Sequence, residues 1–180
     1  MAKPLIHIFG ASGSGTSTLG RFCAETLGYR FMDTDDYFWL PTNPPYTTSR
    51  DREKRLQLIR SDYDKSSGAV LSGSLVGWGD PLIALFTLAV RMITPTDVRM
   101  ERLHIRESDK FGARIEPGGD MYKDHLEFMA WAERYDTAGF EQRSKVEHDE
   151  WEKGLPCPVI HVDGTMPCDE IFVEIKKALW

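Results

Sequence analysis

A run of glycines and hydroxyl side chains at residues 10–18, GASGSGTST, has a spacing suited to binding phosphate. Glycine tolerates backbone angles that turn successive N–H groups toward one point, where they can bind anionic oxygen. The run matches the phosphate-loop pattern G-x-x-x-x-G-K-[ST] except at the lysine position, which is Thr16. The residues that we expect around the phosphates are Gly10, Ser12, Gly13, Ser14, Gly15, Thr16, Ser17 and Thr18.

Thr16 changes what this loop can do without removing its main-chain donors. Lysine would place a mobile positive charge over the β- and γ-phosphates, where negative charge builds up during phosphoryl transfer. Ser17 still stands where the pattern places a hydroxyl ligand for Mg²⁺. The alternative interpretation is a glycine-rich turn whose hydroxyl groups cap a helix. We favour a phosphate loop that obtains its positive charge from elsewhere in the chain.

Three arginines of one expected helix are the first candidates for that charge. Arg99, Arg102 and Arg106 fall at i, i+3 and i+7, so they share one helical face. Like charges at this spacing repel one another unless an anion faces them, which favours phosphate contact. The alternative is a solvated face on which nearby acids neutralise the arginines.

The segment that follows this helix provides further candidates. It contains glycines at 112, 118 and 119 that could act as hinges of a lid. Arg21, by contrast, lies more than one helical turn beyond the loop and is expected to point away from it. The lid arginines that could reach the phosphates on closure are Arg114, Arg134 and Arg143.

A cluster of carboxylates is the second chemical signal. Asp33, Asp35 and Asp36 follow an expected strand, and the carboxyl ends of parallel strands share one edge of a sheet. Carboxylates there could hold Mg²⁺, orient a substrate hydroxyl or accept its proton. The alternative is that one aspartate caps a turn and the others are solvated. Aromatic residues nearby, including Trp39 and Trp78, either line an acceptor pocket or belong to the core.

Strands that alternate with helices must position these groups, which indicates an α/β fold with a parallel sheet. The expected strands are 4–9, 29–33, 69–74, 86–93 and 158–163. The expected helices are 16–27, 51–65, 96–110 and 169–179, with two more helical stretches between 111 and 157.

Composition narrows the class of protein further. The length of 180 residues fits one domain, and no repeat or linker composition interrupts it. A net charge of -6 argues against nucleic-acid or membrane partners, both of which require basic surface. The three cysteines show no metal or disulfide spacing, so we expect a cytoplasmic protein.

The ordered segments GASGSGTST, FMDTDD, VLSGS, RLHIRE and VDGTMP resemble those of the small P-loop kinases, the group that includes adenylate kinase, other nucleoside monophosphate kinases and shikimate kinase. The closer resemblance is to a bacterial group that carries GASGSGT in place of the lysine form. It implies a three-layer P-loop fold with strand order 2-3-1-4-5. It also implies an acceptor-binding segment at about 36–67 and a lid at about 106–140, within a single domain, 1–180.

The resemblance also implies roles for particular residues. Ser17 and Asp33 would serve the metal, and Asp35 the acceptor hydroxyl, as in the D-x-D of shikimate kinase. Arg102 and Arg106 match arginines that stand at the start of a lid. Asp163 and Gly164 would flank the adenine of ATP. The chain departs from adenylate kinase after its third strand, where it has no D-G-F-P-R stretch, and this argues against AMP as acceptor.

The expected function is therefore phosphoryl transfer from Mg²⁺-ATP to a small acceptor, either a nucleoside or nucleotide or a small hydroxylated metabolite. The protein would act as a monomer or homodimer. The alternative is a nucleotide-binding sensor or scaffold, or a weak NTPase, that lacks efficient kinase activity because the lysine is Thr16.

Overall fold

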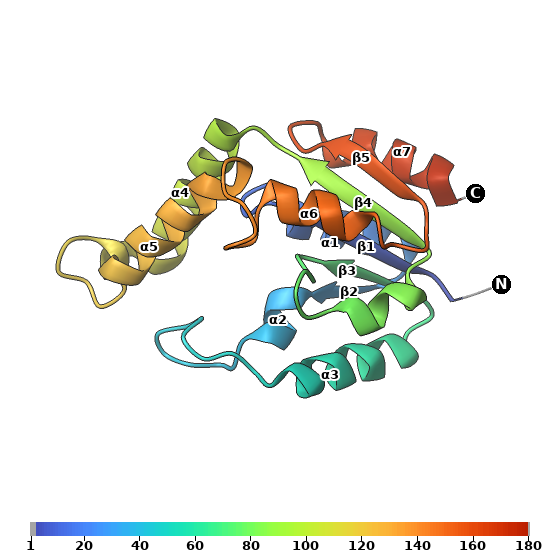
Figure 1. Cartoon of the computed structure of the whole chain (residues 1–180), viewed down its shortest axis with the longest axis horizontal. Coiled ribbons are helices and arrows are strands. Elements are labelled where there is room, and N and C mark those ends of the chain that lie inside the picture. The colour runs from blue at the N-terminus through green and yellow to red at the C-terminus, as the bar shows by residue number, and fades with distance from the viewer. Residues whose placement is uncertain (1–2, 180) are drawn as a thin grey trace.

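A computed structural model describes residues 3–179 of the chain. Its centre is a parallel sheet with the order β2-β3-β1-β4-β5, as the resemblance to the small P-loop kinases implies (Figure 1). Every strand pair is parallel, so all five strands end at the same edge. The strands are β1 (Leu5–Gly10), β2 (Arg30–Asp33), β3 (Ala69–Ser72), β4 (Leu88–Ile93) and β5 (Val159–Asp163).

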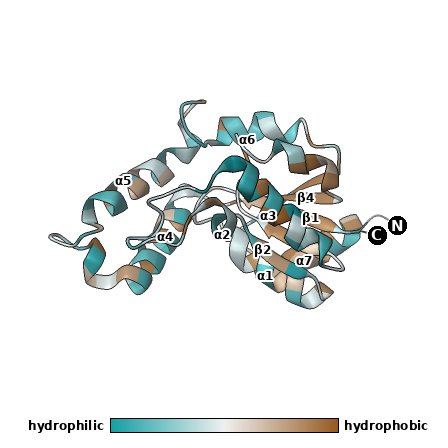
Figure 2. Cartoon of the chain, turned by 90° about the horizontal axis from the view of Figure 1, so that it is seen from below, coloured by the Kyte–Doolittle hydropathy of each residue, from teal (hydrophilic) through white to brown (hydrophobic). Residues whose placement is uncertain are grey.

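Helices cover both faces of the sheet. The central strands are therefore buried on both sides, and their sequences are continuous apolar runs. Figure 2 shows this apolar character in β1 and β4, whereas the helices carry most of the hydrophilic surface. The helices are α1 (Thr16–Leu27), α2 (Thr34–Phe38), α3 (Arg52–Asp64), α4 (Thr96–Phe111), α5 (Tyr122–Glu133), α6 (Lys145–Glu152) and α7 (Cys168–Leu179).

One core lies between the sheet and helices α1 and α7. Leu19 and Cys23 of α1 pack there with Ile171 and Ile175 of α7. Helix α1 ends where Gly28 adopts the left-handed conformation, as its position after an apolar stretch predicts. Because α1 packs against the sheet directly after β1, the conformation of the loop that joins them, residues 11–15, is restrained at both ends.

The opposite core contains α3 and the 3₁₀ turn Asp80–Leu85, together with aromatic side chains from α6. It includes two fully buried histidines, His7 of β1 and His148 of α6. His7 stacks on Phe9 and Phe86. His148 contacts Ser74 Oγ at 2.9 Å and Tyr135 Oη at 2.7 Å. Desolvation lowers the pKa of each histidine to about 3, so both are neutral.

Helices α4 and α5 form an arm that extends beyond the edge at which the strands end (Figure 1). The loop between α2 and α3 approaches the far part of this arm. Arg114 Nη2 donates to Asn43 Oδ1 at 2.9 Å, and Lys110 donates to the hydroxyl of Tyr46. The arm covers most of the segment in which the sequence predicts a lid, and the loop it contacts lies in the predicted acceptor segment.

Helices long and apolar enough to cross a bilayer were not found among residues 3–179.

Candidate active site

The loop between β1 and α1 has the backbone geometry of an anion cradle. Gly13 and Gly15 have φ values of 81° and 99°, which side chains other than glycine strongly disfavour. A Cβ atom on Gly13 would also lie 2.6 Å from the carbonyl oxygen of Arg99. Gly15 offers no side chain to cap α1, so the first N–H groups of the helix point toward a site that an anion can occupy.

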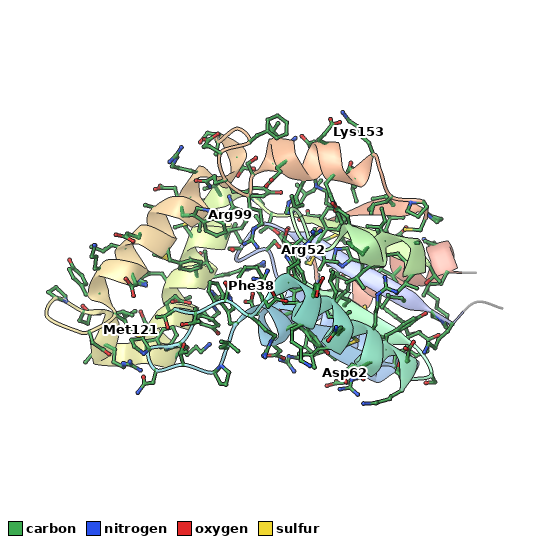
Figure 3. The ribbon with its side chains drawn as sticks, turned by 60° about the horizontal axis from the view of Figure 1, so that its bottom comes forward. Phe38, Arg52, Asp62, Arg99, Met121 and Lys153 are labelled. Carbon is green, nitrogen blue, oxygen red and sulfur yellow. The ribbon has the colours of Figure 1, made fainter. Side chains whose placement is uncertain are left out.

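Arg99 holds this loop in place and is not a phosphate ligand. Its side chain is fully buried at the junction of the arm and the sheet (Figure 3). It donates to the carbonyls of Ser12 at 3.4 Å and Ala132 at 3.1 Å, and it pairs with Asp136 at 2.8 Å. The three arginines therefore do not form one phosphate-binding face. Arg99 points inward, and its N–H groups donate to protein acceptors.

Arg102 joins the phosphate loop to the loop after β5. Its Nη1 donates to the carbonyls of Gly164 at 2.9 Å and Ser14 at 3.4 Å. A Cβ atom on Gly164 would lie 2.0 Å from Thr94 Oγ1 and 2.8 Å from the Ser14 carbonyl, so this close approach requires glycine. The phosphate loop and the loop after β5 thus lie against each other and form one wall of the candidate site.

Asp163, the residue before Gly164, organises the turn at this wall. Its carboxylate accepts hydrogen bonds from the backbone N–H and the hydroxyl of Thr165, at 2.8 and 2.7 Å. These hydrogen bonds keep its pKa below the ordinary range. The structure thus brings Asp163 and Gly164 beside the phosphate loop, where the resemblance to kinases expects the adenine.

Ser17 and Asp33 connect the phosphate loop to the carboxylate cluster. Ser17 Oγ donates to Asp33 Oδ2 at 2.7 Å, and Asp33 Oδ1 accepts from the backbone N–H of Asp35 at 3.1 Å. Asp33 therefore caps α2, as the alternative interpretation expects of one aspartate, and its other carboxylate oxygen faces the phosphate loop. A hydroxyl and a carboxylate at this distance fit a Mg²⁺ ion that keeps phosphate and water among its ligands.

Protein-only metal clusters, with three or more His, Cys, Asp or Glu side chains gathered together, do not occur within residues 3–179. A magnesium site of the kind described would draw its remaining ligands from the phosphates and from water, and it would not need such a cluster.

Asp35 is a carboxylate whose electrostatic setting differs from that in water. Its side chain reaches solvent, yet enough protein surrounds it that desolvation raises its pKa. The charge of Asp33 raises the pKa further, while Arg143 and Arg106 oppose the rise. A carboxylate with a raised pKa is a better proton acceptor, which suits a general base.

Arg143 lies closer to the phosphate loop than its sequence position suggests. Its Nη2 donates to Ser12 Oγ at 2.7 Å, and its guanidinium lies 4.7 Å from the ring centroid of Trp131. The other two lid candidates lie elsewhere: Arg114 pairs with Asp120, and Arg134 pairs with Glu141 at the surface. The sequence could not select Arg143, because 131 residues separate it from Ser12.

Arg106 pairs with Glu107 at 2.9 Å, and its side chain is 55% exposed. Its charge nevertheless lowers the pKa of Asp35, so it belongs to the rim of the site.

A cavity of about 300 Å³ opens beside Asp35, in the predicted acceptor segment. Trp39 and Tyr46 meet edge to face in its wall, with ring centroids 6.0 Å apart. Trp78 is buried in the core, so the aromatic residues divide between pocket and core. The cavity is lined by Asp35, Asp36, Trp39, Leu40, Pro41, Thr42, Pro45, Tyr46 and Arg50.

Comparison with known protein sequences finds a full-length relative. The chain is 39% identical over 168 residues to the "Uncharacterized protein YqaC" of Bacillus subtilis (strain 168), and the match covers 93% of each chain. No protein-family model matches the sequence.

Solved structures share the fold at lower identity. A gluconokinase from Sinorhizobium meliloti 1021 superposes with a TM-score of 0.52 at 23% identity, over 98% of this chain and 91% of that one. The shikimate kinase of Aquifex aeolicus superposes with a TM-score of 0.53 at 17% identity, over 97% of this chain and 95% of that one. The parallel sheet and its phosphate-loop crossover are thus those of small kinases.

Proposed function

Because this chain belongs to the family of Bacillus subtilis YqaC and has the fold of the small P-loop kinases, we propose that it transfers the γ-phosphoryl group of ATP to a small acceptor. The acceptor would be a nucleoside or nucleotide, or a small hydroxylated metabolite. The observation that carries the proposal is the 2.7 Å hydrogen bond between Ser17 and Asp33, which joins a phosphate cradle to paired carboxylates.

The donor would occupy the phosphate loop. The N–H groups at the start of α1 would bind phosphate oxygens, and Arg102 would hold the wall near Gly164 against which the base rests. Ser17 and Asp33 would hold Mg²⁺, which when bound neutralises charge on the β- and γ-phosphates.

The acceptor would occupy the cavity next to Asp35. Its hydroxyl oxygen would attack the γ-phosphorus in line with the bond to the bridging oxygen, which breaks to release ADP. The hydroxyl proton would pass to the carboxylate of Asp35 and then to water. The raised pKa of Asp35 supports this assignment, because it brings the carboxylate closer to the proton affinity that general-base catalysis needs.

A nucleotide sensor, or a weak NTPase, is the second candidate function, and Thr16 favours it because threonine cannot supply the lysine charge. A sensor needs to bind the phosphates but does not need a carboxylate of raised pKa beside a cavity. The placement of Asp35 therefore supports an enzyme over a pure binding protein.

The test is a screen of the purified protein with Mg²⁺ and ATP against nucleosides, nucleoside monophosphates, sugar acids and shikimate-like alcohols, with ADP release as the measurement. We expect one class to stimulate ADP release, and we expect Asp35→Asn to remove this stimulation while ATP still binds. Clear ATP binding without stimulation by any acceptor would contradict the kinase and support the sensor.

A further inference from the structure

The phosphate loop itself carries no positive side chain. Its residues from Gly10 to Thr18 are glycine, alanine, serine and threonine. Main-chain N–H groups can bind the phosphates of the ground state, but phosphoryl transfer moves negative charge onto the β- and γ-phosphate oxygens. A cation next to these oxygens typically accelerates the step by orders of magnitude. A nearby arginine must therefore take the place of the lysine if the loop is to support transfer.

Most arginines near the loop already have other partners. Arg99 is buried and bonded to three carbonyls and to Asp136. Arg102 donates to the carbonyls of Gly164 and Ser14, which builds the wall of the site. Arg21 lies over the ring of Phe31, 4.3 Å from its centroid. These three side chains support the loop or face away from it.

Arg143 has a different environment. One of its terminal nitrogens donates to Ser12 Oγ, and its Nε is buried with no hydrogen-bond partner within residues 3–179. Its charge also acts on Asp35, the carboxylate at the acceptor cavity. Burial lowers the pKa of the Arg143 guanidinium, yet arginine stays protonated at neutral pH. A desolvated cation with an unused donor is strongly attracted to an anion.

The two groups near Arg143 mark the path of the reaction. Ser12 belongs to the loop that would hold the donor phosphates, and Asp35 faces the cavity that would hold the acceptor. The transferring phosphoryl group must cross the space between them. A single guanidinium that contacts Ser12 and acts on Asp35 is placed beside that space, where its planar donors can bind two phosphate oxygens at once.

We propose that Arg143 is the catalytic cation that replaces the missing lysine of the phosphate loop, and that its guanidinium binds the transferring phosphoryl group. This inference rests on the proposed phosphoryl transfer. The bond from the γ-phosphorus to the bridging oxygen breaks as the bond to the acceptor oxygen forms, and Arg143 remains protonated throughout. Its contribution is to stabilise the charge that passes to the β-phosphate of the leaving ADP.

The test moves the positive charge from residue 143 to residue 16. Arg143→Met removes the cation, and Arg143→Met with Thr16→Lys returns a cation at the ordinary place in the loop. Arg134→Met is the matched control, because Arg134 lies in the same stretch of chain but pairs with Glu141 at the surface. We expect Arg143→Met to lower turnover about 100-fold or more, and the added lysine to restore about tenfold or more of it. The control should stay within about twofold of the wild type.

A binding measurement separates this inference from the choice of reaction. Calorimetry would compare Mg²⁺-ADP alone with Mg²⁺-ADP plus aluminium fluoride, which imitates the phosphoryl group in transfer. Arg143→Met should weaken the second complex about 100-fold but the first by less than about fivefold, and Thr16→Lys should reverse the difference. This result would stand even if no acceptor were found and the kinase were replaced by an NTPase.

Three outcomes would overturn the inference. Equal binding of the aluminium fluoride complex by wild type and Arg143→Met would show that Arg143 does not meet the transferring group. A rise in the acceptor KM without a fall in kcat, together with no rescue by Thr16→Lys, would make Arg143 an acceptor ligand instead. If the wild type bound no nucleotide at all, both this inference and the proposed function would fail.

Discussion

Two neighbouring aspartates have different environments at the edge of the sheet. Asp33 uses one carboxylate oxygen for Ser17 and the other for the N–H of Asp35, so both oxygens are occupied by donors. Asp35 accepts no comparable hydrogen bond from the described residues, and desolvation raises its pKa. Environment thus separates a carboxylate that is hydrogen-bonded to the phosphate loop and to α2 from one that is free to accept a proton.

A substitution at Asp35 tests this separation. A raised pKa means that the charged form of Asp35 is less stable in the folded protein than in the unfolded chain. The charge of Asp35 therefore destabilises the folded protein above the raised pKa. This destabilisation disappears as the pH falls toward the ordinary value near 4. We therefore predict that Asp35→Asn increases the free energy of unfolding at neutral pH and lowers turnover by about 100-fold or more.

Urea unfolding at neutral pH and at about pH 4 measures the first effect, and acceptor-stimulated ADP release measures the second. The stability gain should shrink at the lower pH, because protonation there removes much of the charge of Asp35 from the folded protein. A variant less stable than the wild type at neutral pH would contradict the prediction.

At the scale of elements, the site depends on how closely two loops approach each other. The loop after β5 meets the phosphate loop at Gly164, with Thr94 and the Ser14 carbonyl too near for a Cβ atom. Arg102 then bonds to both loops. The wall is therefore a joint product of β1, β4 and β5, although only the first of these strands leads into the glycine motif.

We predict that Gly164→Ala displaces this wall and lowers the affinity for ADP about tenfold. The added methyl group would lie 2.0 Å from Thr94 Oγ1, so at least one loop must move. Gly154→Ala is the control, because its nearest neighbour would be 3.5 Å away, an ordinary contact. Calorimetric titration with ADP measures both variants. Unchanged affinity in Gly164→Ala would show that the wall does not contact the nucleotide.

The sequence predicts most elements of this fold but not all of its contacts. Continuous apolar runs identify β1 and β4 because buried parallel strands have few polar residues. Helix α2 escapes prediction because its residues, TDDYF, are too few to show a helical period. Spacing places Ser17 at the hydroxyl position of the phosphate motif, whereas the contact of Arg143 with Ser12 depends on how the chain after the arm folds back. No local pattern encodes that return.

At the scale of the whole molecule, two neutral histidines make stability depend on pH. His7 and His148 have pKa values of about 3 in the folded protein, because burial excludes the charged form. In the unfolded chain each would bind a proton near pH 6.5. Stability from these groups is therefore complete above about pH 6.5 and is lost as the pH falls toward 3.

We predict that the free energy of unfolding falls by about 2 kcal/mol between about pH 6.5 and about pH 5.5, since two histidines each lose about 1 kcal/mol over this interval. Urea unfolding across this range measures the loss. The exposed His104 is the control, and His104→Gln should lose the same amount. Stability that is constant across this interval would show that the two buried histidines do not remain neutral.

Ser12 is held from two directions by residues of the arm and the segment after it. Arg99 of α4 takes its carbonyl, and Arg143 takes its hydroxyl. The loop and the arm therefore cannot vary independently. A chimera that combined this phosphate loop with the arm of another kinase would lose both restraints unless the two arginines were transferred with it. In this protein the phosphate loop, the arm and the segment that contains Arg143 have to be engineered together.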